Sequence, residues 1–259
     1  MKRLIFDSHA HYDDEAFAPD REELLQSLPE KGVCTVVSMG ADYEGCKGAL
    51  DLASRYSYIY AAVGIHPENV AELPSDYLSQ LEEWAKQPKV VAIGEIGLDY
   101  HYKDMAPREV QKKVFEDQIL LAKRLNLPIV VHDRDAHGDT MEILRRHRPK
   151  GVVHCFSGSV EMMREVVSLG MYIGLGGVVT FQNARVAVEV AKEVPLTSLL
   201  TETDAPYLAP VPFRGKRCDS SMIRYVAQRI GEIRGQSADE ILLAARHNAE
   251  TLFDIIAEE

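Results

Sequence analysis

Short runs of apolar and β-branched residues recur along the whole chain, and longer amphipathic stretches separate them. A short run that is apolar at every position is typical of a strand covered on both faces, whereas strict alternation is typical of a strand with one wet face. The pattern therefore predicts eight buried strands. They cover residues 4–7, 33–38, 60–64, 90–94, 129–131, 152–153, 172–175 and 199–201.

The stretches between these predicted strands have the periodicity of helices. One of them places four apolar residues on one helical face and its lysines elsewhere. These four residues are Val110, Val114, Leu121 and Leu125. Near the end of the chain, Ser237 stands three residues before Glu240, a spacing that predicts a capping box at the start of the last helix.

Strands that alternate with helices of crossover length predict a parallel α/β sheet. Eight such units close most simply into a single (β/α)8 barrel of the TIM type, with its active site at the C-terminal ends of the strands. An open, doubly wound sheet is the alternative, but no glycine-rich dinucleotide motif follows the first predicted strand. Since no linker or low-complexity tract divides the chain, we expect one domain over residues 1–259.

Composition and charge narrow the function. A chain of 259 residues is of the usual size for such a barrel, and its net charge of -11 repels a polyanion at long range. A nucleic-acid substrate would thus need local cations or a small basic cluster. The four cysteines form no C-x-x-C pair, and no apolar run could span a bilayer. We expect a cytoplasmic protein without a signal peptide, membrane contact or obligate protein partner.

Histidines and acids stand where several predicted strands end. In an extended segment, residues two apart point to the same side, so His9 and His11 can bind one ion together. The C-terminal ends of the strands meet at one mouth of a parallel barrel, which predicts that further ligands converge there. The candidate ligands are His9, His11, Glu95, His132, His154 and Asp204.

Six ligands are too many for one tetrahedral ion that keeps a position open for water. Two divalent ions that share Glu95 as a bridge would use them all. Imidazole and carboxylate together suit zinc, manganese, iron or nickel and, less well, magnesium. Because two neighbouring ions can activate water and hold the oxygens of a phosphoryl displacement, the predicted reaction is hydrolysis.

Five motifs, in order along essentially the whole chain, resemble those of the TatD family of metal-dependent deoxyribonucleases, within the amidohydrolase-like barrel superfamily. The resemblance implies a barrel with one or two divalent ions on the six candidate ligands, and hydrolysis of DNA phosphodiesters, for example as an exonuclease. The motifs are Asp7-Ser8-His9-Ala10-His11, Gly64-Ile65-His66-Pro67, Gly94-Glu95-Ile96-Gly97-Leu98-Asp99-Tyr100, His154-Cys155-Phe156-Ser157-Gly158 and Glu202-Thr203-Asp204-Ala205-Pro206-Tyr207.

Within this reading, Asp204 is the expected general base and Glu95 the bridging ligand. We expect the scissile phosphate to be oriented by His66 and Arg134. The densest basic run of the chain follows the last predicted strand and adds a further anion-binding candidate. It contains Arg214, Lys216 and Arg217. Phe213 and Cys218 in the same loop depart from the family pattern, so substrate preference is the least transferable expectation.

Two other functions fit part of the pattern. A metal-dependent amidohydrolase or deacylase could use the same ions on a carbon-nitrogen or ester bond. Such enzymes often bridge their metals with a modified lysine on the fourth strand, where this chain has Glu95, and this favours the phosphodiesterase. A noncatalytic nucleic-acid-binding barrel would not need converging ligands. The remaining histidines are expected in solvent or packing roles; they are His101, His137, His147 and His247.

Overall fold

The computed structural model describes residues 2–257. This part of the chain contains eight strands, and each overlaps one of the predicted runs. The main difference is that β1, β4 and β5 continue beyond the predicted ends, into the residues that carry the candidate ligands. The strands are β1 (Ile5–Ala10), β2 (Val33–Met39), β3 (Ile59–Val63), β4 (Val90–Asp99), β5 (Ile129–Arg134), β6 (Gly151–Val153), β7 (Tyr172–Leu175) and β8 (Leu199–Thr201).

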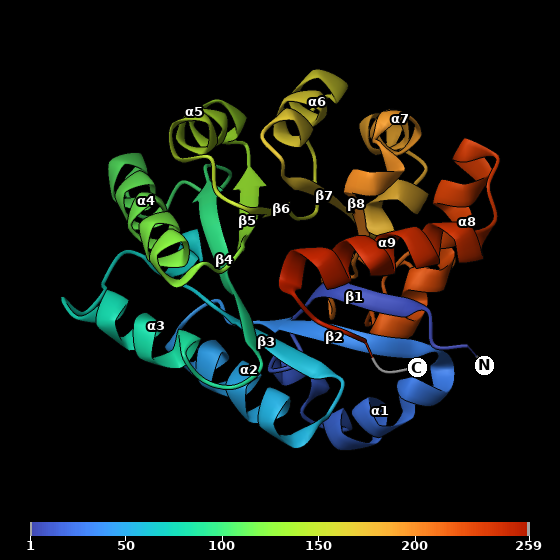
Figure 1. Cartoon of the computed structure of the whole chain (residues 1–259), viewed down its shortest axis with the longest axis horizontal. Coiled ribbons are helices and arrows are strands. Elements are labelled where there is room, and N and C mark those ends of the chain that lie inside the picture. Colours follow the sequence, from blue (N-terminus) through green and yellow to red (C-terminus); the bar gives the residue numbers. More distant parts are fainter. Residues whose placement is uncertain (1, 258–259) are drawn as a thin grey trace.

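Helices connect successive strands, and two more follow the last strand. Figure 1 shows them around the outside of the sheet. They are α1 (Arg21–Ser27), α2 (Tyr43–Arg55), α3 (Tyr77–Ala85), α4 (Arg108–Leu125), α5 (His137–His147), α6 (Val160–Ser168), α7 (Arg185–Glu193), α8 (Ile223–Arg234) and α9 (Ala238–Phe253). In the part of the chain that the structure describes, none is long and apolar enough to cross a bilayer.

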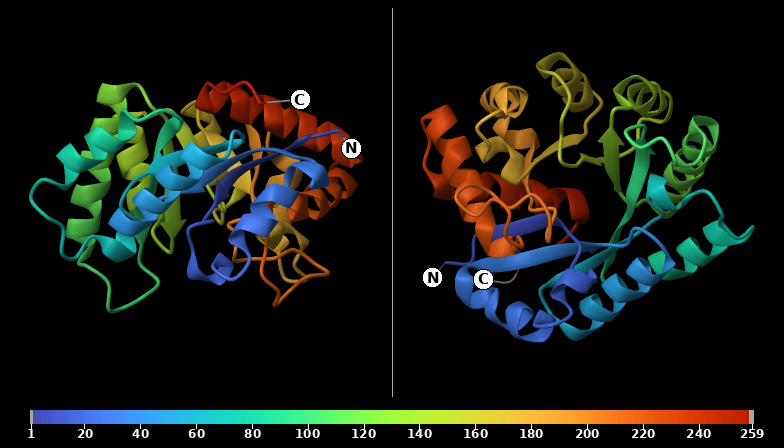
Figure 2. Two further views of the ribbon diagram at one scale, coloured as in Figure 1. Left: turned by 90° about the horizontal axis from the view of Figure 1, so that it is seen from below. Right: turned by 180° about the vertical axis from the view of Figure 1, so that it is seen from behind.

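The strands pair in chain order from β1 to β8, and every pair is parallel. A parallel bridge between Ala10 and Ala205 joins the end of β1 to the segment after β8. Helix α9 packs against both β1 and β8, at the seam where the sheet closes (Figure 2). The predicted (β/α)8 barrel is confirmed, and the open sheet is excluded.

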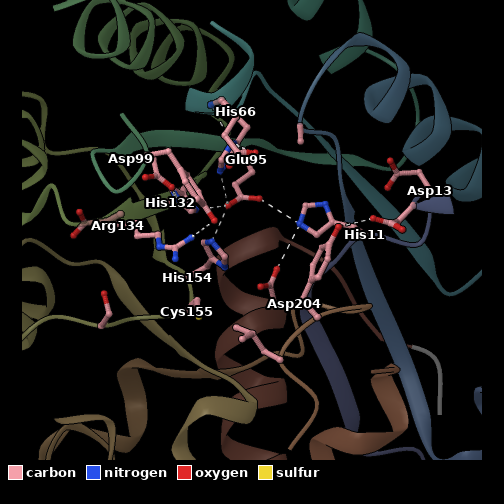
Figure 3. Close-up of a pocket in the computed structure, with 18 residues that line it drawn as sticks. His11, Asp13, His66, Glu95, Asp99, His132, Arg134, His154, Cys155 and Asp204 are labelled. Carbon is pink, nitrogen blue, oxygen red and sulfur yellow. Dashed lines mark hydrogen bonds and ion pairs between the residues drawn. The ribbon is translucent and has the colours of Figure 1, made fainter. Parts of the chain in front are cut away.

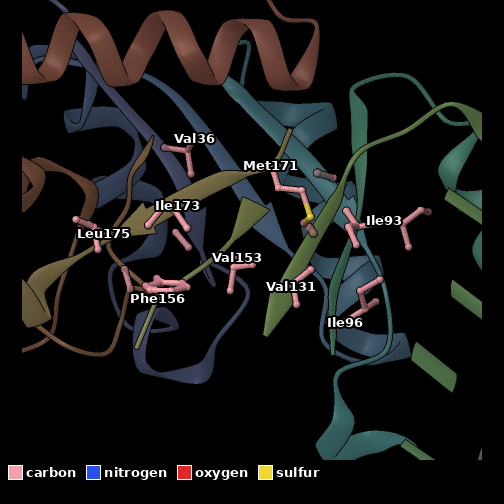
Figure 4. Packing of buried hydrophobic residues seen from close by; sticks show 14 of the residues in the cluster. Val36, Ile93, Ile96, Val131, Val153, Phe156, Met171, Ile173 and Leu175 are labelled. Carbon is pink, nitrogen blue, oxygen red and sulfur yellow. The ribbon is translucent and has the colours of Figure 1, made fainter. Parts of the chain in front are cut away.

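Buried hydrophobic side chains fix the barrel. Val36 on β2 belongs to the same buried cluster as residues of β4 to β7, and Figure 4 shows several of them together. Among these are Ile93, Val131, Val153 and Ile173, none more than 1% exposed. Because both faces of most strands are covered, continuous apolar runs were the correct signal.

Helix α4 differs from the prediction in which side chains it buries. Val110 is 37% exposed, whereas Gln111 and Gln118 are almost fully buried. The Gln118 amide accepts from the Ile65 N–H at 2.8 Å and donates to the Ile65 carbonyl at 3.1 Å. A glutamine can be buried in this way because both ends of its amide are paired. Of the four residues on the predicted apolar face, Val110 is the one that the fold leaves exposed.

The capping box at the start of α9 is confirmed. The Ser237 hydroxyl accepts from the Glu240 N–H, and the Glu240 carboxylate accepts from the Ser237 N–H at 2.8 Å. These contacts satisfy two backbone donors that would otherwise be unpaired at the helix N-terminus.

Candidate metal centre

A cavity of about 720 Å³ lies at the C-terminal ends of the strands. Its lining comes from the ends of β4 and β5 and from the segments that follow β1, β2, β3, β6 and β8. Figure 3 shows the candidate side chains pointing toward one another across it. The mouth that the parallel topology predicts is therefore where the histidines and carboxylates meet.

Glu95 occupies the centre of this group (Figure 3). Its carboxylate is nearly fully buried, and its two oxygens face different histidines. Oε2 lies 3.3 Å from Nε2 of both His9 and His11. Oε1 lies 2.8 Å from Nε2 of His154 and 2.9 Å from Nδ1 of His132. One carboxylate thus joins two groups of imidazoles.

The first group is completed by Asp204. The Nε2 atoms of His9 and His11 are 3.1 Å apart, and Oδ1 of Asp204 is 3.6 Å from each. The backbone N–H of Asp204 donates to the His9 carbonyl at 3.0 Å, which ties the two segments together. Two histidines, a glutamate and an aspartate, from three separate parts of the barrel, therefore lie within reach of one ion.

The second group includes a histidine that we expected to bind phosphate. His66 places Nε2 at 3.7 Å from Oε1 of Glu95, and its ring is 4.3 Å from that of His132. Ligand atoms of His66, Glu95 and His132 lie within 4.8 Å of one another. The ring of His66 thus lies beside the ligand set. Its Nδ1 accepts from the Glu68 N–H at 3.2 Å, which leaves Nε2 directed at the cavity.

The pKa shifts differ among the histidines of the centre, because burial lowers the pKa of His66 to about 3 and lowers that of His9 as well. Burial acts to lower the pKa of His11, but Asp204 and Glu95 raise it to about 10. Burial opposes protonation of His132 as well, yet Asp99 and Glu95 raise its pKa to about 9. Burial would disfavour the charged form of Glu95, but the neighbouring histidines hold its pKa well below the usual value. A donor set of imidazoles around ionised carboxylates fits divalent cations.

Two acidic residues that we did not single out support the histidines. Oδ2 of Asp99 lies 3.0 Å from Nε2 of His132, and Oε1 of Glu202 lies 3.6 Å from Nδ1 of His154. The sequence could have indicated that Asp99 lies near the centre, because residues 95, 97 and 99 share one face of an extended strand. Glu202 belongs to one of the five motifs, but the sequence does not show that its side chain points toward His154.

Asp7 supports the centre from the barrel interior through hydrogen bonds. It is fully buried, and its carboxylate accepts from the hydroxyls of Thr203 and Ser220, both at 2.7 Å. It also accepts from the N–H of Thr203 at 3.0 Å and of His9 at 3.2 Å. Burial raises the pKa of Asp7 to about 7, although these hydrogen bonds oppose the shift. Asp7 thus connects β1 to the segment that carries Asp204.

The basic candidates are placed differently from one another. Arg134 lines the cavity. Arg214 donates to the Ala209 carbonyl at 3.2 Å and lies over the ring of Phe181, and Arg217 forms two hydrogen bonds of 2.6 Å with Asp20. Lys216 is exposed. Neither these two arginines nor Lys216 is among the residues that line the cavity.

The amino-acid sequence is similar to a known protein family and to several named proteins over nearly its whole length. The family model described as "TatD related DNase" matches residues 6–254. An uncharacterized metal-dependent hydrolase of Bacillus subtilis, YabD, is 42% identical over 97% of this chain and 100% of its own length. A protein of Pantoea ananatis named 3'-5' ssDNA/RNA exonuclease TatD is 31% identical, with 97% of this chain and 100% of that protein covered.

Among solved structures, the fold is similar to that of the TatD homologue YjjV of Escherichia coli. The TM-score is 0.92 at 36% sequence identity, with 99% of this chain and 100% of that chain covered. A TatD family hydrolase of Entamoeba histolytica has a TM-score of 0.88 at 24% identity, over 98% of this chain and 99% of that chain, which supports the fold alone.

Proposed function

Because the chain belongs to the TatD family, we propose that it is a divalent-metal-dependent hydrolase that cleaves phosphodiester bonds in single-stranded DNA, as an exonuclease. The name of the Pantoea ananatis relative supports a nucleic-acid substrate, and the names of other relatives support metal-dependent hydrolysis. The same name includes RNA, so RNA is a second substrate to test.

One observation carries this proposal: the two oxygens of Glu95 face different histidines, with Oε2 beside His9 and His11 and Oε1 beside His132 and His154. His9, His11 and Asp204 would hold one ion with Glu95, and His132 and His154 would hold a second. We propose zinc, manganese, nickel or magnesium for these positions. Such ions, when bound, polarise phosphoryl oxygens and lower the pKa of water.

Asp204 is proposed as the general base. Its side chain is 19% exposed, compared with 4% for Glu95, so it is the ligand carboxylate that a water in the cavity can approach. The backbone tie to His9 fixes the position from which it accepts the proton. Glu95, buried between two histidine groups, serves instead to hold the centre together.

Residues on the other side of the cavity are proposed to orient the phosphate. With Nδ1 of His66 occupied by the Glu68 N–H, Nε2 carries the ring proton and can donate to a phosphoryl oxygen. Arg134 can contact a second oxygen, since it also lines the cavity. Lys216, and with it the loop of Arg214 and Arg217, would contact a longer strand outside the cavity.

The test is hydrolysis of a 5'-labelled single-stranded oligonucleotide by protein reloaded with magnesium, manganese or zinc. We expect a ladder that shortens from the 3' end with at least one of these metals, and loss of activity with a chelator. A DNA duplex and an RNA strand of the same sequence establish the preferred substrate. An N-acyl amino acid tests the amidohydrolase alternative.

The matched control is Asp204→Asn, which keeps the size of the side chain and one coordinating oxygen but removes its basicity. It should retain much of its metal and lose about 100-fold or more in kcat, the usual effect of a positioned base. Equal activity of the metal-loaded variant would remove Asp204 from this role. Hydrolysis of the amide without hydrolysis of any oligonucleotide would overturn the proposed function.

A further inference from the structure

Two tyrosines are exposed on the lining of the cavity, one beside each half of the metal centre. Tyr102 is 50% exposed and Tyr207 is 54% exposed, in contrast to the buried Glu95 between the two halves. Tyr102 follows β4 and contacts Arg134, whereas Tyr207 follows the β8 segment and contacts Asp14. Figure 3 shows that Arg134 lies on one side of Glu95 and that Asp13, the neighbour of Asp14, lies on the other.

The ring of Tyr102 is held by two neighbours. The guanidinium carbon of Arg134 lies 5.0 Å from the ring centroid, and Nη1 donates to the phenolic oxygen at 3.2 Å. The His101 ring packs edge-on at 4.9 Å and is itself fixed by Asp135, 2.8 Å from its Nδ1. The ring is thus positioned before any substrate arrives, which reduces the entropy lost on binding.

Tyr207 is held in a comparable way on the opposite side. Its hydroxyl donates to Oδ2 of Asp14 at 2.7 Å, and its backbone N–H donates to the Asp204 carbonyl at 2.8 Å. The second contact ties the tyrosine directly to a residue of the metal centre. Its exposed surface therefore lies at a fixed place relative to the reacting phosphate.

Charge alone gives this cavity little affinity for a nucleic acid. Among the described residues that line it, Arg134 is the one arginine or lysine, whereas Asp13, Asp14 and Glu68 add negative charge beyond the ligand set. Bound cations can hold the scissile phosphate, but these carboxylates repel the neighbouring phosphates. Affinity for the nucleotides on either side must therefore come from uncharged contacts, and exposed aromatic rings are suited to that role.

We propose that Tyr102 and Tyr207 are stacking platforms for the nucleobases that flank the scissile phosphodiester. The inference rests on the proposed function and assigns two side chains to the recognition of unpaired bases at the reacting end of the strand. A base inside a duplex has both faces covered and is held to its partner, whereas the bases at an unpaired end can separate from one another and stack on protein rings without regard to sequence. Arg134, already placed over Tyr102, adds a cation to that platform.

The experiment compares two single-stranded substrates of equal charge. One oligonucleotide has natural bases throughout, and the other has abasic residues at its last two 3' positions. Metal-loaded wild type, Tyr102→Leu and Tyr207→Leu are assayed on both, and Tyr102→Phe and Tyr207→Phe serve as variants that keep the ring. Tyr225→Leu is the matched control, because Tyr225 is also exposed but packs on Phe213 outside the cavity.

We expect each leucine variant to lose about 10-fold or more in kcat/KM on the natural strand, mainly through KM, since stacking of one base contributes an effect of this size. On the abasic strand the leucine variants should match wild type. Tyr225→Leu should stay close to wild type on both substrates. The phenylalanine variants keep the stacking face but lose the hydroxyl contacts to Arg134 and Asp14, so each should lose less on the natural strand than the matching leucine variant.

Equal losses on the natural and abasic strands would overturn the inference, because they would mean that the tyrosines only support the fold. Unchanged kinetics on the natural strand would overturn it as well. In both cases wild type still cleaves DNA and the proposed function stands. If wild type cleaves neither oligonucleotide with any metal, the proposed function fails and the inference fails with it.

Discussion

The imidazole of His132 is held from both sides, with Oδ2 of Asp99 at 3.0 Å from Nε2 and Oε1 of Glu95 at 2.9 Å from Nδ1. An acceptor on one ring nitrogen fixes the proton there and leaves the lone pair of the other nitrogen available to a cation. Asp99 therefore determines how His132 presents itself to the metal centre without lying in the centre itself.

Replacing Asp99 with Ala should weaken metal binding by about 10- to 100-fold, as is usual when the partner of a ligating histidine is lost. Calorimetric titration of the metal-free protein with zinc or manganese measures the change. Asp104→Ala, an exposed acid in the loop that follows β4, is the matched control. An affinity for metal equal to that of wild type in Asp99→Ala would show that His132 orients itself without Asp99.

Replacing Glu95 with Ala should remove metal from both proposed positions, because its two oxygens face the two imidazole groups. His132→Ala should deplete mainly one position, since that ring faces only one oxygen of the bridge. Elemental analysis of dialysed protein gives the number of ions per chain. Unchanged stoichiometry in Glu95→Ala would contradict the bridging role.

Replacing Gln118 with Ala should destabilise the protein by about 2–4 kcal/mol, because the buried N–H and carbonyl of Ile65 would both lose their partner. Chemical denaturation measures the free energy of unfolding. Gln26→Ala, on the exposed side of α1, provides the control. Since Ile65 precedes His66, a loss of activity in the folded variant is also expected. Equal stabilities of the two variants would refute the assigned hydrogen bonds.

His137, outside the metal centre, should give a pH-dependent contribution to stability. Its Nδ1 lies 2.7 Å from Oδ2 of Asp133, and this hydrogen bond, with Asp135 nearby, raises the pKa of His137. A raised pKa means that the protonated form is favoured in the folded state. The stabilisation is therefore complete below about pH 6.5 and disappears as the pH rises through the pKa of the folded protein.

Because the side chain of His137 is 42% exposed, solvent screens the pair, and the effect should stay below about 1 kcal/mol. The difference in unfolding free energy between wild type and His137→Gln should be larger at about pH 5.5 than at about pH 8.5. An NMR titration of the metal-loaded protein measures the pKa directly. A value at or below about 6.5 would contradict the pairing.

The amino-acid sequence by itself determines the barrel and the place of its active centre. Continuous apolar runs separated by amphipathic stretches specify parallel strands with helical crossovers, because both patterns follow from local geometry. Parallel strands bring their C-terminal ends to one mouth, so ligands from His9 to Asp204 could be assigned to one site before their distances were known.

Only the tertiary structure decided which atoms of these residues face each other. The division of the two Glu95 oxygens between imidazole groups depends on side-chain directions that no spacing encodes. Gln118 reads as a polar surface position, and its burial follows from a backbone segment 53 residues away. Arg217 reads as part of a basic loop, yet it pairs with Asp20, which is 197 residues away. Contacts between distant segments depend on how the whole chain packs, and local periodicity contains no information about them.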